Sequence, residues 1–272
     1  HHYQGCGTCV HCSTGWQQLC DEGVKAVFGV TGHDAHAKYM KCPVSTIVPL
    51  RDDISFIGGA AISCGTGTAW GALDRLDLRA SQTIAIFGMG PVGLSAVMLA
   101  HKMGAKVIAA ASSEEKIKTC LEHGADEAFV YPSGNLDRDQ QKELSNKIKE
   151  LTGGLGANVV YDPVGGTFSE PALRAIAWEG RFLVIGFAAG EIPKPPLNLA
   201  LLKGCQIVGV FWCAWTTMFP HENMTNFQEL FDLHAAGKIN PEISDRFSLE
   251  ESAAAIAHLK DRKAKGKVII DV

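Results

Sequence analysis

The stretch Thr83–Gly93, TIAIFGMGPVG, constrains the fold more than any other part of the sequence. Its first half, Thr83–Phe87, is a run of apolar and β-branched residues, long enough for a buried strand and too short for a helix. Its second half is a G-x-G-x-x-G motif. Pro91 suits the first turn of a following helix, where its missing N–H costs nothing, and apolar residues continue beyond the motif at helical spacing. The sequence therefore predicts a strand, a tight glycine turn and a helix in succession.

Each residue of the motif has a physical role in binding a dinucleotide. Gly88 makes the tight turn, Gly90 lets the backbone approach a pyrophosphate, and Gly93 lets helix and strand pack closely. With Pro91 and Val92, these glycines place a helix N-terminus, with its free N–H groups and partial positive charge, beside that pyrophosphate. A bare motif also occurs in structural turns, but here a strand and a helix flank it, which favours a dinucleotide-binding domain.

Composition limits the remaining possibilities. A chain of 272 residues, 46% hydrophobic and 20% charged, is typical of a globular protein with one large or two ordinary domains. The net charge of −4 gives no electrostatic reason to expect nucleic acid as a partner. No apolar run reaches membrane-spanning length and no signal peptide is visible. Four of the 9 cysteines cluster, which suits a reducing compartment. We expect a cytoplasmic protein with a small-molecule substrate, and neither nucleic acid nor membrane as a partner.

The clustered cysteines have the spacing of a metal site. Cys6, Cys9, Cys12 and Cys20 form C-x2-C-x2-C-x7-C on a glycine-rich loop. Four thiolates make a closed tetrahedral shell, which is typical of a structural zinc without a catalytic role. An iron–sulfur cluster is the alternative, because C-x2-C-x2-C also begins some ferredoxin motifs. Those motifs place the fourth cysteine differently and usually follow it with proline, whereas Asp21 follows here. The spacing favours zinc.

The order of these features resembles the medium-chain dehydrogenase/reductase superfamily, to which the zinc alcohol dehydrogenases belong. The similarity covers essentially the whole chain: a four-cysteine lobe, a strand-rich stretch, a cysteine and then the glycine motif. It implies a Rossmann domain, a doubly wound parallel α/β sheet, beside a partial GroES-like β-barrel catalytic domain. We expect a partial catalytic domain at 1–62, the Rossmann domain at 63–240 and a return to the catalytic domain at 241–272. Gly32–Pro49 resembles the place where the barrel chain re-enters a sheet.

The resemblance also identifies one residue of a catalytic zinc site. Cys64, within Ala60–Leu73, occupies the position of the third catalytic-zinc ligand; taken alone, it suits a small buried residue before a helix. The family's other ligands, a cysteine and a Gly-His-Glu, lie upstream of the four-cysteine lobe. Because the chain starts just before that lobe, we expect it to lack the family's N-terminal segment. One cysteine cannot hold a catalytic zinc, and His33, Asp34 and His36 are better explained as exposed loop residues.

Beyond the motif, strands alternate with helices, as a doubly wound sheet requires. The expected strands are 106–110, 128–131, 158–161, 181–185, 206–211 and 267–270. The first expected helix starts with Ser112 and Glu115 at capping-box spacing, and its inward residues are Ile117, Cys120 and Leu121. The second has Leu144, Ile148 and Leu151 on its inward face. Two more helices are expected at 171–178 and 227–236.

The end of the second strand bears on the cofactor. An NAD enzyme places a carboxylate there to bind the ribose hydroxyls, but this chain has Ala-Ala-Ala-Ser-Ser at 109–113. The missing acid, with the nearby Ser112, Ser113 and Lys116, favours NADP(H) over NAD(H). The segment and Tyr131 are similar to the NADPH-dependent quinone reductases of the superfamily, whose corresponding residues surround the 2′-phosphate. The alternative is that Ser112 only caps a helix and that Lys116 is a solvated surface charge.

Later segments resemble the same quinone reductase branch. They include YDPVGG at 161–166, EGRFLVIGF at 179–187 and VFW at 210–212. The resemblance implies that loops carrying Val164, Gly186, Phe187 and Phe211 border the nicotinamide. Without it, these loops are ordinary glycine-rich turns.

The front of the chain therefore resembles a zinc alcohol or polyol dehydrogenase, and the back a zinc-independent quinone reductase. A natural mosaic, a divergent relative and a joined chimera each explain this. Three functions follow: transfer of hydride from NADPH to a quinone or activated double bond, zinc-dependent alcohol oxidation, and NADPH binding without catalysis. The superfamily's dimers and tetramers imply a homo-oligomer.

Overall fold

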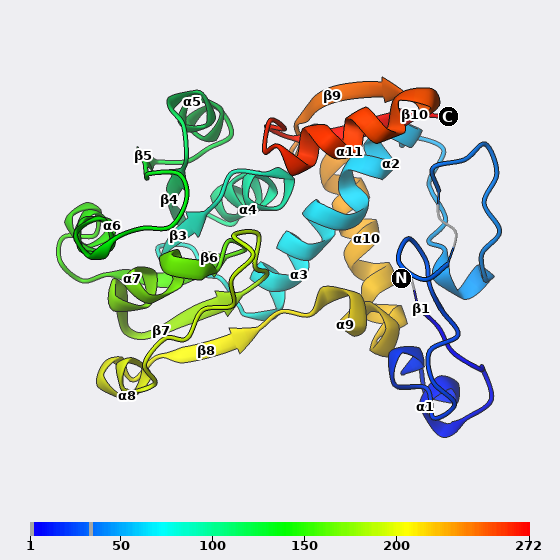
Figure 1. Ribbon diagram of the computed structural model, residues 1–272, viewed down its shortest axis with the longest axis horizontal. Coiled ribbons are helices and arrows are strands. Elements are labelled where there is room, and N and C mark those ends of the chain that lie inside the picture. The colour runs from blue at the N-terminus through cyan, green and yellow to red at the C-terminus, as the bar shows by residue number, and fades with distance from the viewer. Residues whose placement is uncertain (1–2, 33–34) are drawn as a thin grey trace. The chain divides into compact units, whose positions relative to one another are not determined.

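A computed structural model describes residues 3–32 and 35–272 and shows two compact units (Figure 1). The sheet unit comprises Cys64–Val210. The cysteine unit comprises the described residues up to Ser63 together with Phe211–Val272. The contacts thus divide the chain at 210/211, whereas the sequence placed the second crossing at 240/241. The assignment of these units to a cofactor domain and a catalytic domain stays a prediction.

The sheet unit is built on six parallel strands in the order β5-β4-β3-β6-β7-β8. Their bounds are β3 Thr83–Phe87, β4 Lys106–Ala111, β5 Glu127–Val130, β6 Ala157–Asp162, β7 Ile176–Val184 and β8 Gln206–Gly209. The chain runs outward from β3 to β5 and then returns to the other side of β3. This arrangement has its topological switch point between β3 and β6, and the predicted Rossmann fold is confirmed.

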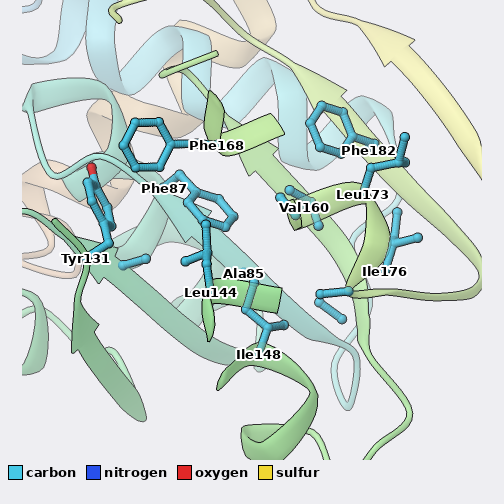
Figure 2. Close-up of a cluster of buried hydrophobic side chains, with 14 of the residues drawn as sticks. Ala85, Phe87, Tyr131, Leu144, Ile148, Val160, Phe168, Leu173, Ile176 and Phe182 are labelled. Atoms are coloured by element: carbon cyan, nitrogen blue, oxygen red, sulfur yellow. The ribbon is translucent and has the colours of Figure 1, made fainter. Parts of the chain in front are cut away.

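Helices cover both faces of this sheet. Helices α4 and α5 pack against β3, β4 and β5, and α3 packs against α4, while α6, α7 and α8 gather on the face that carries the core cluster of Figure 2. The bounds are α3 Gly67–Arg75, α4 Pro91–Lys102, α5 Glu114–Glu122, α6 Arg138–Leu151, α7 Ser169–Arg174 and α8 Asn198–Lys203. With both faces covered, the inner strands bury nearly every side chain, which explains their uninterrupted apolar sequences.

The core cluster joins alternate residues of the strands to the inward faces of α6 and α7 (Figure 2). Phe87 of β3 and Val160 of β6 lie on this face of the sheet. Ile148 of α6 and Leu173 of α7 lie over them and are fully buried. Burial of side chains of this size stabilises a domain by about 1.5–3 kcal/mol each. The cluster therefore fixes the strand ends that precede the loops of the candidate site.

Two helix predictions in this unit need correction. The expected helix at 171–178 ends at Arg174, because the Ala175 N–H closes the last turn and Ile176 starts β7. β7 then contains an irregularity at Glu179, whose φ is +57°. Ile176 and Ala177, at the end of the predicted helix, are buried strand residues, whereas Trp178 is an exposed residue of the same strand.

The helix after β4 also differs in detail. Its cap is Ser113 and not Ser112, since the Ser113 hydroxyl accepts the Lys116 N–H at 3.4 Å. Ile117 and Cys120 are buried as predicted, but Leu121 is 49% exposed. Leu121 lies about 100° around the helix from Cys120. The buried face of α5 is therefore narrower than predicted and does not include Leu121.

The cysteine unit contains two small sheets among its described residues. β1 Tyr3–Gln4 pairs antiparallel with β2 Ala26–Val27, and β9 Ile243–Ser248 pairs parallel with β10 Lys267–Asp271. The other elements are α1 Val10–Ser13, η1 Gln17–Leu19, η2 Val44–Thr46, α2 Phe56–Ala61, α9 Trp212–Met218, α10 Pro220–Ala235, η5 Leu249–Glu251 and α11 Ser252–Lys260; the π-helical turn η3, Ile62–Thr66, crosses into the sheet unit.

One expectation for this unit is not met. The sequence predicted that Gly32–Pro49 re-enters a sheet, but the described part from residue 35 to 49 contains bends and the short 3₁₀ helix η2. His36 lies exposed there, as expected; His33 and Asp34 lie outside the described residues. Within the described chain, no helix combines the length and the apolar character that a membrane span requires.

Candidate functional site

The glycine motif has the geometry that its sequence predicted. A Cβ on Gly93 would lie 1.9 Å from the Gly88 carbonyl oxygen, so only glycine allows α4 to start this close to β3. Gly88 itself has a φ of +69°, a left-handed value that favours glycine. No atom lies within 4 Å of the corresponding position on Gly90, the cap of α4, so its backbone faces open space. The turn therefore leaves the N-terminus of α4 accessible at the carboxyl end of β3.

The loop after β6 meets this turn at the switch point. A Cβ on Gly88 would lie 2.5 Å from Val164 Cγ2, so Val164 packs directly against the first glycine. The loop is held by the carboxylate of Asp162, which accepts the N–H groups of Val164 and Gly165, both at 2.9 Å, and the Ser169 hydroxyl at 2.5 Å. Burial raises the pKa of Asp162, and these hydrogen bonds only partly offset that rise.

Tyr131 follows β5 and is only 7% exposed. Its ring packs on Phe168 with centroids 4.7 Å apart (Figure 2), and its hydroxyl lies 4.0 Å from the position of a Gly88 Cβ. The Tyr131 N–H donates to the Ala111 carbonyl at 2.8 Å, which joins the ends of β4 and β5. The structure thus places Tyr131 beside the glycine motif.

The segment after β4 carries the predicted phosphate-binding residues. Ser112 and Lys116 are half-buried, and the hydroxyl of Ser113 is engaged in capping α5. The first acids are Glu114 and Glu115, which are exposed in the first turn of α5. The end of β4 therefore lacks the carboxylate that would repel a phosphate on the ribose.

The predicted nicotinamide residues are distributed over both units. Gly186 and Phe187 follow β7 and pack near the β6 loop: a Cβ on Gly186 would lie 3.4 Å from the Pro163 carbonyl, and one on Gly165 would lie 2.9 Å from the Phe187 ring. Phe187 is 41% exposed. Phe211 begins the second segment of the cysteine unit and is 65% exposed, so it does not belong to the set that the sheet unit brings together.

Cys64 lies in the π-helical turn before α3 and is exposed. The next residue, Gly65, approaches the first turn of α4, where its Cβ would lie 3.4 Å from the Pro91 carbonyl group. Thr66 then shares a buried hydrogen bond of 3.0 Å with Ser95. Complete burial, together with the Cys64 thiol, raises the pKa of Tyr161 on β6. The structure therefore places Cys64 beside the glycine motif, and the expectation of a small buried residue is not met.

The four clustered cysteines come together in the cysteine unit. Their sulfur atoms all lie within 4.8 Å of one another, and Cys6 Sγ is 3.9 Å from Cys12 Sγ. In a tetrahedral zinc site with Zn–S bonds of about 2.3 Å, the sulfurs lie roughly 3.8 Å apart. Gly5 is required here, because a Cβ would overlap the Cys12 sulfur at 2.3 Å. The thiols therefore have room for one ion of this size.

Local hydrogen bonds prepare the thiols for a cation. The Thr8 hydroxyl and the Thr8 and Cys9 N–H groups lower the pKa of Cys6 to about 6. A backbone hydrogen bond from Gly7 also lowers the pKa of Cys12, but burial and the other thiols outweigh it and raise that pKa to about 12. The cluster thus holds one thiolate easily and resists further negative charge. A divalent cation removes this resistance, since it deprotonates the thiols that it binds.

Sequence reasoning missed the residues that support the site. Asp162 lies in the segment YDPVGG, but sequence reasoning assigned it no role of its own. In the structure its buried carboxylate holds the loop after β6. Ser169, its hydroxyl partner, lies in a helix that the sequence placed two residues too late. An acid directly after a buried strand and before Pro-Val-Gly-Gly was the available signal, because a buried carboxylate needs backbone N–H donors.

Comparisons with known proteins agree with this geometry. The family model described as zinc-binding dehydrogenase matches residues 91–229. The quinone oxidoreductase-like protein 2 homolog of Nematostella vectensis is 34% identical over 250 residues, which cover 90% of this chain and 66% of that protein. Among solved structures, an NAD-dependent alcohol dehydrogenase has a TM-score of 0.76 at 27% identity and covers 99% of this chain and 74% of its own. A mycobacterial protein complexed with NADPH has a TM-score of 0.73 at 25% identity, covering 81% and 66%.

The chain belongs to the zinc-binding dehydrogenase family. This confirms the predicted membership of the medium-chain dehydrogenase/reductase superfamily, including its mixed likeness to quinone oxidoreductases and alcohol dehydrogenases. The chain spans about two thirds of the length of the Nematostella relative.

Proposed function

We propose that the protein is an NADPH-dependent oxidoreductase that reduces a quinone or another activated carbonyl or enone substrate. The glycine turn at the switch point carries this proposal, because its open Gly90 and closely packed Gly93 provide the cradle that a dinucleotide pyrophosphate needs. The likeness to a quinone oxidoreductase-like protein supports the substrate class.

The cofactor would be held along one edge of the sheet. Gly88–Gly93 and the first turn of α4 would bind the pyrophosphate, while Val164, Gly186 and Phe187 would border the nicotinamide. Bound NADPH supplies the hydride and thus the redox chemistry. The chain's own part is to position the ring against the acceptor and to exclude water. Asp162 supports this by holding the Val164 loop rigid through two N–H groups and one hydroxyl.

The choice of NADPH over NADH rests on charge at the end of β4. Ser112, Ser113 and Lys116 offer hydroxyls and a cation, and no carboxylate lies between Ala109 and Ser113. Tyr131, beside the glycine turn, is proposed to complete the 2′-phosphate site. The likeness to a mycobacterial protein solved with NADPH also supports this choice.

The four clustered thiols fit a structural zinc in number, spacing and chemistry. Cys6, Cys9, Cys12 and Cys20 would bind the ion, which supplies a covalent-like crosslink for the lobe around α1. Without an open coordination position, that ion has no part in the reaction. We also infer a homo-oligomer and a cytoplasmic protein.

The first test is Gly90→Ala. A methyl group there meets no protein atom, so we expect the free energy of unfolding to change by less than about 1 kcal/mol. Because the methyl occupies the pyrophosphate cradle, the Kd for NADPH should rise at least tenfold, as measured by fluorescence titration. Unchanged affinity in a stable variant would remove the glycine turn from the cofactor site.

The second test adds the missing acid. Ser112→Asp places a carboxylate after β4, where it repels a 2′-phosphate and can accept the ribose hydroxyls of NADH. We expect the ratio of NADPH affinity to NADH affinity to fall by roughly tenfold or more. A tenfold change corresponds to a difference of about 1.4 kcal/mol in binding free energy. Ser81→Asp adds the same charge before the amino end of β3 and is the control. An equal loss in both variants would indicate general electrostatics and not a 2′-phosphate site.

Cys64 is the residue that a zinc-dependent alcohol oxidation would use. The described residues do not fit a catalytic zinc, because the one group of three or more neighbouring metal ligands among them is the four-cysteine cluster. The measurement is NADPH consumption with a simple quinone, before and after a chelator that removes weakly held metal. Activity that survives both chelation and the substitution Cys64→Ser supports quinone reduction. Activity that requires both the chelatable metal and Cys64 would favour the zinc-dependent alternative.

A further inference from the structure

Helices α6, α7 and α8 of the sheet unit neighbour one another (Figure 1). Residues from all three line a second concave surface. This helix groove has a volume of about 740 Å³, and its walls come from these three helices alone. None of its residues belongs to the proposed cofactor site. Its volume is in the range of specific binding sites, but such sites are mostly apolar, whereas this one is lined by long cationic side chains.

One wall is a row of cations on α6. Arg138, Lys142 and Lys149 follow one another at intervals of four and seven residues, so they lie on the same side of the helix, with Ser145 between them. None of the three cations has an ion pair with the described residues, whereas Lys147, the remaining lysine of the helix, pairs with Glu150 at 3.2 Å. In a chain with a net charge of −4, a row of unpaired cations in a groove is a local reversal of the overall charge.

The opposite wall, from α7 and α8, is partly apolar. Leu199 is buried at its base, and Leu202 is 65% exposed beside it. The Arg174 guanidinium is neutralised by Glu170 at 2.7 Å, and Lys203 donates to the Ile176 carbonyl at 3.1 Å. The groove therefore presents a cationic side to a ligand and, facing it, the exposed side chain of Leu202 above the buried Leu199.

The first two cations have the spacing of side chains on one side of an extended chain. Arg138 and Lys142 lie about 6 Å apart along α6, Ser145 lies between Lys142 and Lys149, and the whole row spans roughly 16 Å. In an extended peptide, side chains on one side recur about every 6.6 Å and those between them point the other way. A strand that alternates carboxylates and apolar side chains would thus face both walls at once.

We infer that the helix groove binds an extended acidic segment of a partner protein in which carboxylates alternate with apolar residues. The two unlike walls carry this inference, because a polyanion without apolar groups would leave Leu202 exposed. Single-stranded nucleic acid is less well matched, since its binding sites use aromatic side chains to stack bases and this groove has none among its lining residues.

The test uses the full chain and a fluorescein-labelled peptide of alternating Glu and Leu, measured by fluorescence anisotropy. We expect saturable binding to one site per chain that weakens as salt increases, because the cations are exposed. A peptide of alternating Glu and Ser should bind at least tenfold more weakly. Equal binding of both peptides, or displacement by inorganic polyphosphate and by oligonucleotide at similar charge concentrations, would reduce the groove to a general anion surface and overturn the inference.

A pair of matched variants locates the site. R138Q/K142Q/K149Q removes the row, and K102Q/K118Q/K147Q removes the same charge from other surfaces of the sheet unit. We expect the first to raise the peptide Kd at least tenfold and the second to change it less than threefold. NADPH affinity, measured alongside, should be unaffected in both. Equal Kd values for the two variants would contradict the assignment to this groove, whatever the outcome of the cofactor tests.

Discussion

The two units of this chain achieve order in different ways. In the sheet unit, long apolar strands and helices bury one another, and all of the largest fully buried side chains except Ile62 belong to it. In the cysteine unit, the described sheets have only two strands each, and α1 is four residues long. Two-stranded sheets and single-turn helices are marginal on their own. Apolar burial explains the first unit and the 16-residue helix α10 of the second, whereas the lobe around α1 needs a crosslink such as its four thiols can provide.

Removal of the proposed zinc crosslink should have the largest effect. Cys20→Ser takes away one buried thiol of the cluster, and structural zinc sites contribute on the order of 10 kcal/mol to folding in small metal-dependent domains. We expect loss of bound zinc, measured by elemental analysis, and loss of hydrogen-exchange protection around α1 and η1. Protection of β3, β4 and β6 should be unchanged.

Cys42→Ser is the matched control, because Cys42 is a half-buried thiol of the same unit outside the cluster. It should keep the zinc and the protection of α1. If both substitutions leave the lobe protected, its order does not depend on a metal, and the contrast between the two units fails.

A core substitution should destabilise the sheet unit and leave the cysteine unit unchanged. Leu173→Ala removes a fully buried side chain from the cluster of Figure 2, and such substitutions cost about 2–5 kcal/mol. We expect the free energy of unfolding of the sheet unit, measured by denaturant titration, to fall by about 3 kcal/mol. The zinc content should be unchanged. Leu121→Ala is the control: because its side chain is 49% exposed, its effect should stay below about 1 kcal/mol. Similar losses would mean that Leu121 faces the core after all.

The difference between the units also explains what the sequence could predict. Buried parallel strands are continuous apolar runs, so β3 was predicted to the residue and β4 to within one residue. The glycine motif was equally clear: Gly88 and Gly93 each have a steric reason within the chain, and Gly90 faces open space. In the cysteine unit, the spacing of four cysteines predicted their cluster, but the conformation of 35–49 did not follow, since short irregular segments carry no periodicity.

Other features depended on contacts that sequence alone does not contain. The role of Asp162 requires knowing that its loop bends back so that two N–H groups reach one carboxylate. The start of β7 requires knowing that Ile176 pairs with Ala157 of β6. Both are consequences of tertiary pairing, which overrides local propensity.

The smallest effect that separates the units is their response to acid. In the cysteine unit, hydrogen bonds from Arg51 and Arg246 lower the pKa values of Asp53 and Asp271. Stability from these pairs is present above about pH 4, the pKa of a free aspartate, and is lost as pH falls through the lowered folded values. In the sheet unit, burial raises the pKa of Asp162, so the sign is reversed. Its contribution is present below about pH 4 and is lost as pH rises through the folded pKa.

Asp162→Asn isolates the second effect. The amide keeps an oxygen for the Val164 and Gly165 N–H groups and does not ionise, so the decrease in sheet-unit stability from pH 4 upward should be smaller than in the native chain. Each unit of difference between the free and folded pKa values changes the free energy of unfolding by about 1.4 kcal/mol. Asp53→Asn should instead reduce only the loss of stability that the cysteine unit shows as pH falls. Urea unfolding from pH 3 to 8, followed by hydrogen exchange in each unit, distinguishes the two variants. If Asp162→Asn leaves the slope of the sheet unit unchanged, then its three donors keep that carboxylate ionised across the range, and the two units respond to acid in the same direction.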